Sequence, residues 1–177
     1  MKTCIALFRG INVGGKNLLP MKELVAVLEE LGCRDVRTYI QSGNAVFTCA
    51  GREAPKLPER IRQAIKKLRG FEPQVLVLEP GEIEQAMKNN PFPEAVDEPQ
   101  TLHVGFLATT PAAPDLEGLE NLRIPSEQFR LIGQVFYLHA PAGIGNSRLA
   151  AGAEKRLGVP MTARNWKTVC RLRDMAG

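Results

Sequence analysis

The segment TCIALFRGINVGGKN, residues 3–17, decides the fold of this chain because it holds a strand and the loop that leaves it. Residues 3–8 are apolar on both faces, which is typical of a central strand covered on both sides. The glycines that follow allow positive φ angles, so the chain can turn sharply. Residues 20–31 then carry apolar side chains at helical spacing and predict a helix.

The same patterns continue along both halves of the chain. The first half has further predicted strands at 36–40, 44–49 and 74–78 and a helix at 57–70. After a linking helix at 81–88, the second half has predicted strands at 101–107, 128–132, 135–139 and 161–164 and helices at 115–121, 147–157 and 166–175. Each half therefore has the β-α-β-β-α-β order of a ferredoxin-like fold.

We predict an α+β fold of two related ferredoxin-like halves in tandem, packed as one compact protein. The N-terminal half, residues 1–90, contains the glycine-rich loop, and the C-terminal half, residues 100–177, ends in a basic helix. Residues 90–100 contain three prolines and predict the loop that joins the halves.

Composition limits the class of protein. The chain has 177 residues, of which 44% are hydrophobic, enough for a substantial core. The first apolar run is too short for a signal peptide and no run is long enough to span a membrane, so we expect a cytoplasmic protein without a membrane partner. The four cysteines are far apart in sequence, and we expect reduced core residues rather than metal ligands or disulfides. We expect no metal and no cofactor.

Charge is segregated along the chain despite a net charge of only +4. Residues 1–78 carry 13 Lys/Arg against 7 Asp/Glu, residues 79–127 carry 2 against 10, and residues 128–177 carry 8 against 2. Two explanations are open. Either the acidic middle block complements the basic ends within the fold, or the basic ends meet in a surface that binds phosphates.

Residues 10–17, GINVGGKN, fall one residue short of a phosphate-binding loop, because Asn17 stands where the Ser or Thr that holds Mg²⁺ is required. Three alternatives remain: a tight strand-to-helix connection, an anion site and, least favoured, a nucleotide hydrolase. Backbone amides of Gly14 and Gly15 and the charge of Lys16 would hold an anion. Without the hydroxyl, we expect no appreciable Mg²⁺-dependent hydrolysis of ATP or GTP.

Two further segments carry polar groups. Residues 41–44, QSGN, form a predicted hairpin turn, which in such a sheet can lie at either end relative to the glycine-rich loop; turn chemistry alone also explains these residues. Near the C-terminus, Asn165 is a candidate N-cap of the last helix, and Trp166 either stacks on a planar ligand or anchors that helix to the core.

The second hairpin offers a weak aromatic and basic face. Alternation places Arg130, Tyr137 and His139 on one side, but the pattern of an RNA-recognition motif is missing. The chain contains only two histidines and no nucleophile-elbow sequence, so hydrolase and metalloenzyme functions find no support.

Three blocks of sequence resemble the bacterial domain-of-unknown-function 1697 family. They are RGINVGGKN at 9–17, TYIQSGN at 38–44 and the C-terminal residues SR at 147–148, EK at 154–155 and TARNWKTV at 162–169. The resemblance covers the whole chain, with Ala45 and Lys167 departing from the pattern. It implies a small cytoplasmic α+β protein of two related halves and no established activity.

From these blocks we expect one site assembled from both halves, which binds a phosphorylated or otherwise anionic small ligand, nucleotide-like in character. Its expected residues are Arg9, Asn12, Gly14, Gly15, Lys16, Asn17, Gln41, Ser42, Asn44, Arg148, Lys155, Arg164, Asn165 and Trp166. Whether a reaction occurs there is left open. The alternatives are a nucleic-acid-binding protein and a structural or interaction module that uses open sheet edges.

Overall fold

The computed structural model describes all 177 residues and divides them into two compact units. Unit 1 comprises Met1–Glu84 together with Leu172–Gly177, and unit 2 comprises Gln85–Arg171. The C-terminal segment, which the sequence places in the second half, therefore packs with the first unit. There the Arg37 guanidinium donates a hydrogen bond to the backbone oxygen of Met175.

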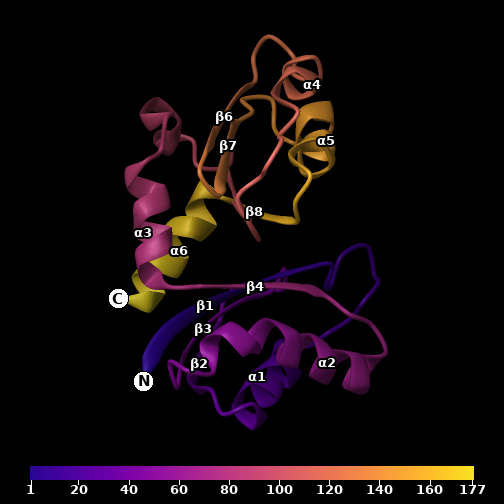
Figure 1. The fold of residues 1–177 in the computed structure, drawn as a ribbon, viewed down its shortest axis with the longest axis vertical. Coiled ribbons are helices and arrows are strands. Elements are labelled where there is room, and N and C mark those ends of the chain that lie inside the picture. Colours follow the sequence, from indigo (N-terminus) through magenta and orange to yellow (C-terminus); the bar gives the residue numbers. More distant parts are fainter. The chain divides into compact units, whose positions relative to one another are not determined.

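Unit 1 contains one four-stranded sheet (Figure 1). In chain order its elements are β1 (Lys2–Arg9), α1 (Met21–Glu30), β2 (Arg34–Thr38), β3 (Asn44–Cys49), the 3-10 helix η1 (Ala54–Lys56), α2 (Leu57–Arg69), β4 (Gln74–Leu78) and α3 (Pro80–Lys88), which continues into unit 2. The strands lie in the order β2-β3-β1-β4 and every neighbouring pair is antiparallel. This is the ferredoxin-like arrangement.

Unit 2 repeats the arrangement. Its elements are the 3-10 helix η2 (Pro93–Asp97), β5 (Leu102–Leu107), α4 (Leu116–Glu120), β6 (Gln128–Ile132), β7 (Val135–His139), α5 (Arg148–Leu157), β8 (Met161–Asn165) and α6 (Trp166–Ala176), which belongs to unit 1 from Leu172 on. The strand order β6-β7-β5-β8 is that of unit 1, with all pairs antiparallel. The predicted fold class, two tandem ferredoxin-like halves, is confirmed. No helix has the length and apolar character needed to cross a membrane.

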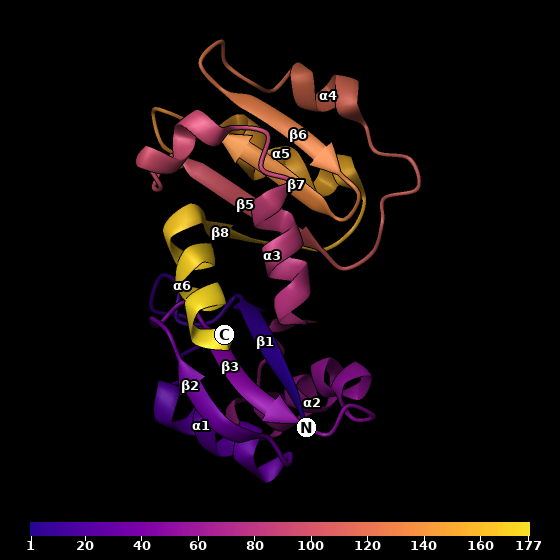
Figure 2. The same cartoon turned by 90° about the vertical axis from the view of Figure 1, so that its left-hand side faces the viewer.

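Each sheet is covered on one face by its two crossover helices (Figure 2). In unit 1, Phe8 and Phe47 of the sheet pack in a buried cluster with Leu28 of α1 and Ile61 of α2. In unit 2 the corresponding cluster combines sheet residues such as Phe136 with α4 and α5. These apolar faces follow from the helical spacing of the sequence, because residues three and four apart share one side of a helix.

Strand β2 differs from its prediction. The strand predicted over 36–40 is found at Arg34–Thr38, and Ile40 leaves it with a φ of 51°. The reason is Asn44, which is fully buried and whose Nδ2 donates to the backbone oxygen of Tyr39 at 2.9 Å. This bond closes the hairpin before residue 40, so residues 40–43 form the connection, which we call the β2–β3 turn.

Gly43 closes this turn against β1. Its carbonyl oxygen accepts a hydrogen bond from the Phe8 N–H at 2.9 Å, and its φ is 88°. A Cβ added at this position would lie 2.5 Å from Cδ1 of Ile11 and 2.6 Å from Cβ of Phe8. The position therefore requires glycine for two separate reasons, backbone conformation and space.

We predict that Gly43→Ala lowers the free energy of unfolding by about 2–4 kcal/mol, because left-handed strain and a core clash add together. Gly70→Ala is the matched control: its φ is 78° and nothing lies within 4 Å of an added Cβ, so it should cost only about 1 kcal/mol. Urea unfolding of both variants measures the difference. Equal losses would contradict the close packing at residue 43.

Three of the four cysteines lie in the core of unit 1. Cys4, Cys33 and Cys49 are buried, and the Sγ atoms of Cys4 and Cys49 are 3.4 Å apart. Burial raises the pKa of the Cys4 thiol to about 12 and that of the Cys33 thiol to about 11. Both thiols stay neutral at physiological pH and pack as small apolar side chains.

These raised pKa values predict that the protein loses stability above about pH 9, where thiols of the unfolded chain ionise. Between that pH and the pKa of the folded state, the unfolded chain releases protons that the folded chain keeps, so unfolding becomes easier. Urea unfolding of the wild type and of Cys33→Ala at about pH 8 and pH 10.5 tests this. The wild type should lose more stability between the two conditions, and identical losses would count against the prediction.

Candidate functional site

The loop after β1 and the β2–β3 turn lie at the same end of the unit 1 sheet. Strands β1 and β2 run parallel with β3 between them, so the connections that follow them leave the sheet on the same side. Nδ2 of Asn12 donates to the backbone oxygen of Gln41 at 2.9 Å. Two of the three sequence blocks, whose adjacency the pattern alone left open, are therefore brought together.

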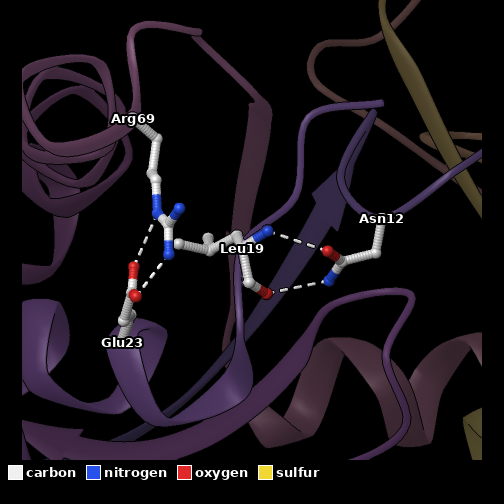
Figure 3. Close-up of polar contacts among 4 residues, drawn as sticks. All are labelled: Asn12, Leu19, Glu23 and Arg69. Atoms are coloured by element: carbon white, nitrogen blue, oxygen red, sulfur yellow. Dashed lines mark hydrogen bonds and ion pairs between the residues drawn. The ribbon is translucent and has the colours of Figure 1, made fainter. Parts of the chain in front are cut away.

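Asn12 holds this end of the unit by its side-chain amide (Figure 3). Its Oδ1 accepts from the Leu19 N–H at 2.8 Å, while its Nδ2 donates to the Leu19 carbonyl oxygen at 2.9 Å as well as to Gln41. Its φ of 53° belongs to the left-handed region, which asparagine tolerates better than most residues. The Asn12 side chain thus braces the two connections, and both N–H donors of its amide are used within the protein.

The glycine loop, residues 10–17, is a miniature hairpin. Val13 and Lys16 form an antiparallel bridge, with the Lys16 N–H donating to the Val13 carbonyl oxygen at 3.0 Å. Between them, Gly14 and Gly15 have φ angles of 58° and 73°, as a type I′ turn requires. A phosphate-binding loop leads directly into its helix, whereas here α1 begins only at Met21.

Asn17, which replaces the hydroxyl residue of a phosphate-binding loop, braces the base of this hairpin. Its side-chain Nδ2 donates to the Gly10 carbonyl oxygen at 2.8 Å. The backbone carbonyl oxygen of Asn17 accepts from the backbone N–H of Asn12 at 3.1 Å. The side chain therefore has a structural partner at the position where a hydrolase would hold its metal ion.

The tip of the hairpin is exposed, and several of its polar groups have no hydrogen-bond or ion-pair partner within the protein. Lys16 makes no ion pair, and the N–H groups of Gly14 and Gly15 have no hydrogen-bond partner within the protein. Arg9 ends β1 opposite Gln74 of β4, and Ser42 is exposed in the neighbouring turn. The predicted residues of unit 1 are thus gathered at one end of the sheet.

A second brace lies beside this site. The Arg69 guanidinium at the end of α2 binds the Glu23 carboxylate in the first turn of α1 through two hydrogen bonds, with Nε to Oε2 at 2.7 Å (Figure 3). A bidentate pair of this kind fixes geometry as well as adding energy. It joins the two crossover helices where α1 emerges from the glycine loop.

Three exposed apolar residues around this site, Val13, Leu18 and Ile40, are not among the residues predicted from the sequence. The signal was present, because polar residues are usual in turns and these aliphatic ones are not. Each directly adjoins a residue whose polar groups take part in the Asn12 contacts.

In unit 2, the predicted residues are distributed around the sheet. Arg148 is the first residue of α5, which Ser147 caps by accepting from the Ala150 N–H at 3.0 Å. Lys155 is in the last turn of α5, near the beginning of β8, whereas Asn165 ends β8 at the opposite end of the strand. Lys155 and Asn165 therefore lie at opposite ends of the unit 2 sheet.

Arg164 lies on the sheet face away from α5. It pairs with Val104, while its neighbour Ala163 pairs with Gly105 and lines the small cavity beneath α5. Alternation along the strand therefore places Arg164 opposite Arg148 across the sheet. Burial lowers the pKa of Arg164 to about 10, so the guanidinium still carries its charge at neutral pH.

The remaining residues of the third block have structural contacts. Asn165 caps α6, since its Oδ1 accepts from the Thr168 N–H at 2.9 Å. Trp166 is buried, which leaves its ring little surface for a ligand. That this block meets the glycine loop in one site stays a prediction, because the two groups belong to different units.

The aromatic face of the second hairpin is closed. Tyr137 is fully buried and its hydroxyl donates to the backbone oxygen of Ala86 in α3 at 2.7 Å. A base cannot stack on a ring in this position. No group of three or more His, Cys, Asp and Glu side chains is placed to hold a metal ion.

The chain belongs to the family described as "Protein of unknown function (DUF1697)", whose model matches residues 1–137. This range includes the glycine loop and the β2–β3 turn. Among solved structures, the conserved bacterial protein SP0830 from Streptococcus pneumoniae is similar over 99% of this chain and 98% of its own, with a TM-score of 0.69 and 24% sequence identity. At that identity the likeness shows the fold alone. No curated protein matches the chain.

We predict that Asn12→Gly, which permits the left-handed backbone but removes the three amide hydrogen bonds, destabilises the protein by about 1–3 kcal/mol. Asn17→Gly removes one hydrogen bond and serves as the matched control, with a loss of about 0.5–1.5 kcal/mol. Urea unfolding measures both. Hydrogen exchange of the Leu19 amide should accelerate in Asn12→Gly alone, and unchanged protection there would show that Asn12 does not hold the loop.

Proposed function

We propose that this protein binds a phosphorylated or otherwise anionic small molecule, nucleotide-like in character, at the end of unit 1 where the glycine loop meets the β2–β3 turn. The observation that carries the proposal is that backbone N–H donors without a partner lie on a loop whose conformation is fixed. The N–H groups of Gly14 and Gly15 have no partner within the protein, while the loop that holds them is braced by Asn12 and Asn17.

Preorganisation favours binding at such a loop. A flexible loop pays an entropic cost when a ligand orders it, whereas these amides are already fixed by bonds at the base of the hairpin. An anion would accept hydrogen bonds from them, and each charge-assisted bond contributes about 1.5–3 kcal/mol. Lys16, which has no competing carboxylate partner, would add its charge.

Arginines of unit 2 extend the proposal. Arg164 keeps its positive charge, and Arg148 stands at the start of α5. Their contribution depends on the predicted meeting of the third sequence block with the glycine loop. Arg148 begins the helix that covers one face of the unit 2 sheet and Arg164 lies on the other face, so we expect one of the two to contribute more than the other.

The alternatives have less support. For nucleic-acid binding, the one aromatic surface that the sequence suggested is not accessible, because the ring of Tyr137 is fully buried. For assembly through sheet edges, β2 is protected, because its pairing shifts between Arg34 and Arg37 and Asp35 has a φ of 53°. A charged and irregular edge strand pairs poorly with another chain.

We predict that Lys16→Ala weakens binding of pyrophosphate and of ADP by about 5- to 150-fold, the loss of one charge-assisted contact worth about 1–3 kcal/mol. Isothermal titration calorimetry of the full chain measures the affinities. Arg164→Ala should weaken binding in the same range if the two units share the site.

Lys56→Ala is the control for net charge. Lys56 is exposed, makes no ion pair and precedes α2 at the other end of the unit 1 sheet. The affinity of the Lys56→Ala variant for pyrophosphate and for ADP should equal that of the wild type. A wild type that binds neither ligand at millimolar concentration would refute the proposed function, and equal affinities of Lys16→Ala and the wild type would refute its location.

A further inference from the structure

We propose that the anion held at the glycine loop is the phosphate of an organic ester whose organic part presents an apolar face, and that this face packs on Val13, Leu18 and Ile40. The inference rests on the proposed function and adds the chemical class of the ligand. It draws on side chains that the anion site itself does not use.

The three aliphatic side chains are exposed, and each belongs to a residue next in sequence to one that takes part in the Asn12 contacts. Val13 is 64% exposed, Leu18 is 59% exposed and Ile40 is 49% exposed. Val13 follows Asn12 itself, while Leu18 and Ile40 precede the two residues that exchange hydrogen bonds with its amide. Each of the three residues is therefore next in sequence to a residue whose position the Asn12 side-chain bonds fix.

Ile40 has an unfavourable backbone conformation, and packing of its side chain in the core does not explain it. Its φ of 51° lies in the left-handed region, where a β-branched residue is a genuine outlier. The other non-glycine residues with positive φ are Asn12, Asn17 and Asp35, all of types that tolerate this region. Asparagine or glycine would suit the turn better. A strained and exposed isoleucine therefore indicates a use for its side chain outside the folded core.

The mixture of groups selects the ligand class. An inorganic anion would satisfy the Gly14 and Gly15 amides and leave the three aliphatic side chains in water. A wholly apolar ligand would cover those side chains and leave the amides and Lys16 without a partner. Only a molecule that carries both a charged end and an apolar face uses everything that the loop and the turn present.

Three phosphate monoesters of similar charge test the inference: phenyl phosphate, hexyl phosphate and glycerol 1-phosphate. The full-length wild type should bind the better of the first two about tenfold more tightly than glycerol 1-phosphate, because only they carry an apolar face. Titration followed by NMR measures these affinities. Preference for the phenyl ester indicates a ring, as in a nucleotide, and preference for the hexyl ester indicates a chain.

Ile40→Asn isolates the apolar contact. Asparagine accepts the left-handed backbone, so this variant should fold and melt at a temperature equal to or above that of the wild type. It should lose about five- to tenfold in affinity for the preferred ester and keep its affinity for glycerol 1-phosphate. Ile124→Asn, at an exposed isoleucine of unit 2 without positive φ, is the matched control and should bind like the wild type.

The failures can be told apart. If glycerol 1-phosphate binds as tightly as the apolar esters, or if Ile40→Asn keeps their full advantage, the inference is overturned while anion binding stands. If no ester binds, both the inference and the proposed function fail. If Lys16→Ala weakens all three esters and Ile40→Asn weakens only the apolar ones, both are supported.

Discussion

Strand β1 is paired along both edges and buried on both faces. It hydrogen-bonds to β3 on one side and to β4 on the other, and residues Cys4 to Leu7 have no exposed surface. The chain must therefore leave this strand from the middle of the end of the sheet. There the glycine loop emerges between the β2–β3 turn and the beginning of β4. The location of the candidate site is a direct consequence of the central position of β1.

Unit 2 repeats this scaffold without repeating the site. The end of β1 binds the turn before β3 through the Phe8 N–H and the Gly43 carbonyl oxygen, and the end of β5 binds the turn before β7 in the same way, from the Leu107 N–H to the Gln134 oxygen at 2.9 Å. However, the turn in unit 2 has only two residues, and the loop after β5 has prolines in place of the glycine hairpin. The shared contact belongs to the fold, and the additional residues in unit 1 carry the proposed function.

Much of the fold could be predicted from the sequence. At most helices and strands, the spacing of apolar residues and the turn-forming residues at the ends indicate the same element. The strands at 44–49, 74–78, 128–132 and 135–139 are found with the predicted bounds. Strand β2 was misplaced because its end is determined by a buried side chain, Asn44, whose contact with Tyr39 leaves no trace in local periodicity. For the same reason the sequence identified Asn12 as a site residue but not as a brace: its partners are backbone groups 7 and 29 residues away. The return of Leu172–Gly177 to unit 1 was missed because a helix pattern does not reveal which sheet the helix contacts.

The hydrogen bonds of the glycine loop also have different sequence ranges, which sets an order for their formation. The Val13–Lys16 bridge and the Asn17–Gly10 bond close over at most 7 residues, a range in which loops close on a timescale below about a microsecond. The bond from Asn12 to Gln41 spans 29 residues, so we expect it to form later, when the β2–β3 turn has been brought beside the glycine loop. The short-range contacts of the hairpin can therefore close before the sheet is complete, and docking of β3 then adds the bond that ties the loop to the β2–β3 turn. Transient loss of that bond would free the Gln41 end of the β2–β3 turn, which the Phe8–Gly43 bond would still hold against β1, and would leave the hairpin itself intact.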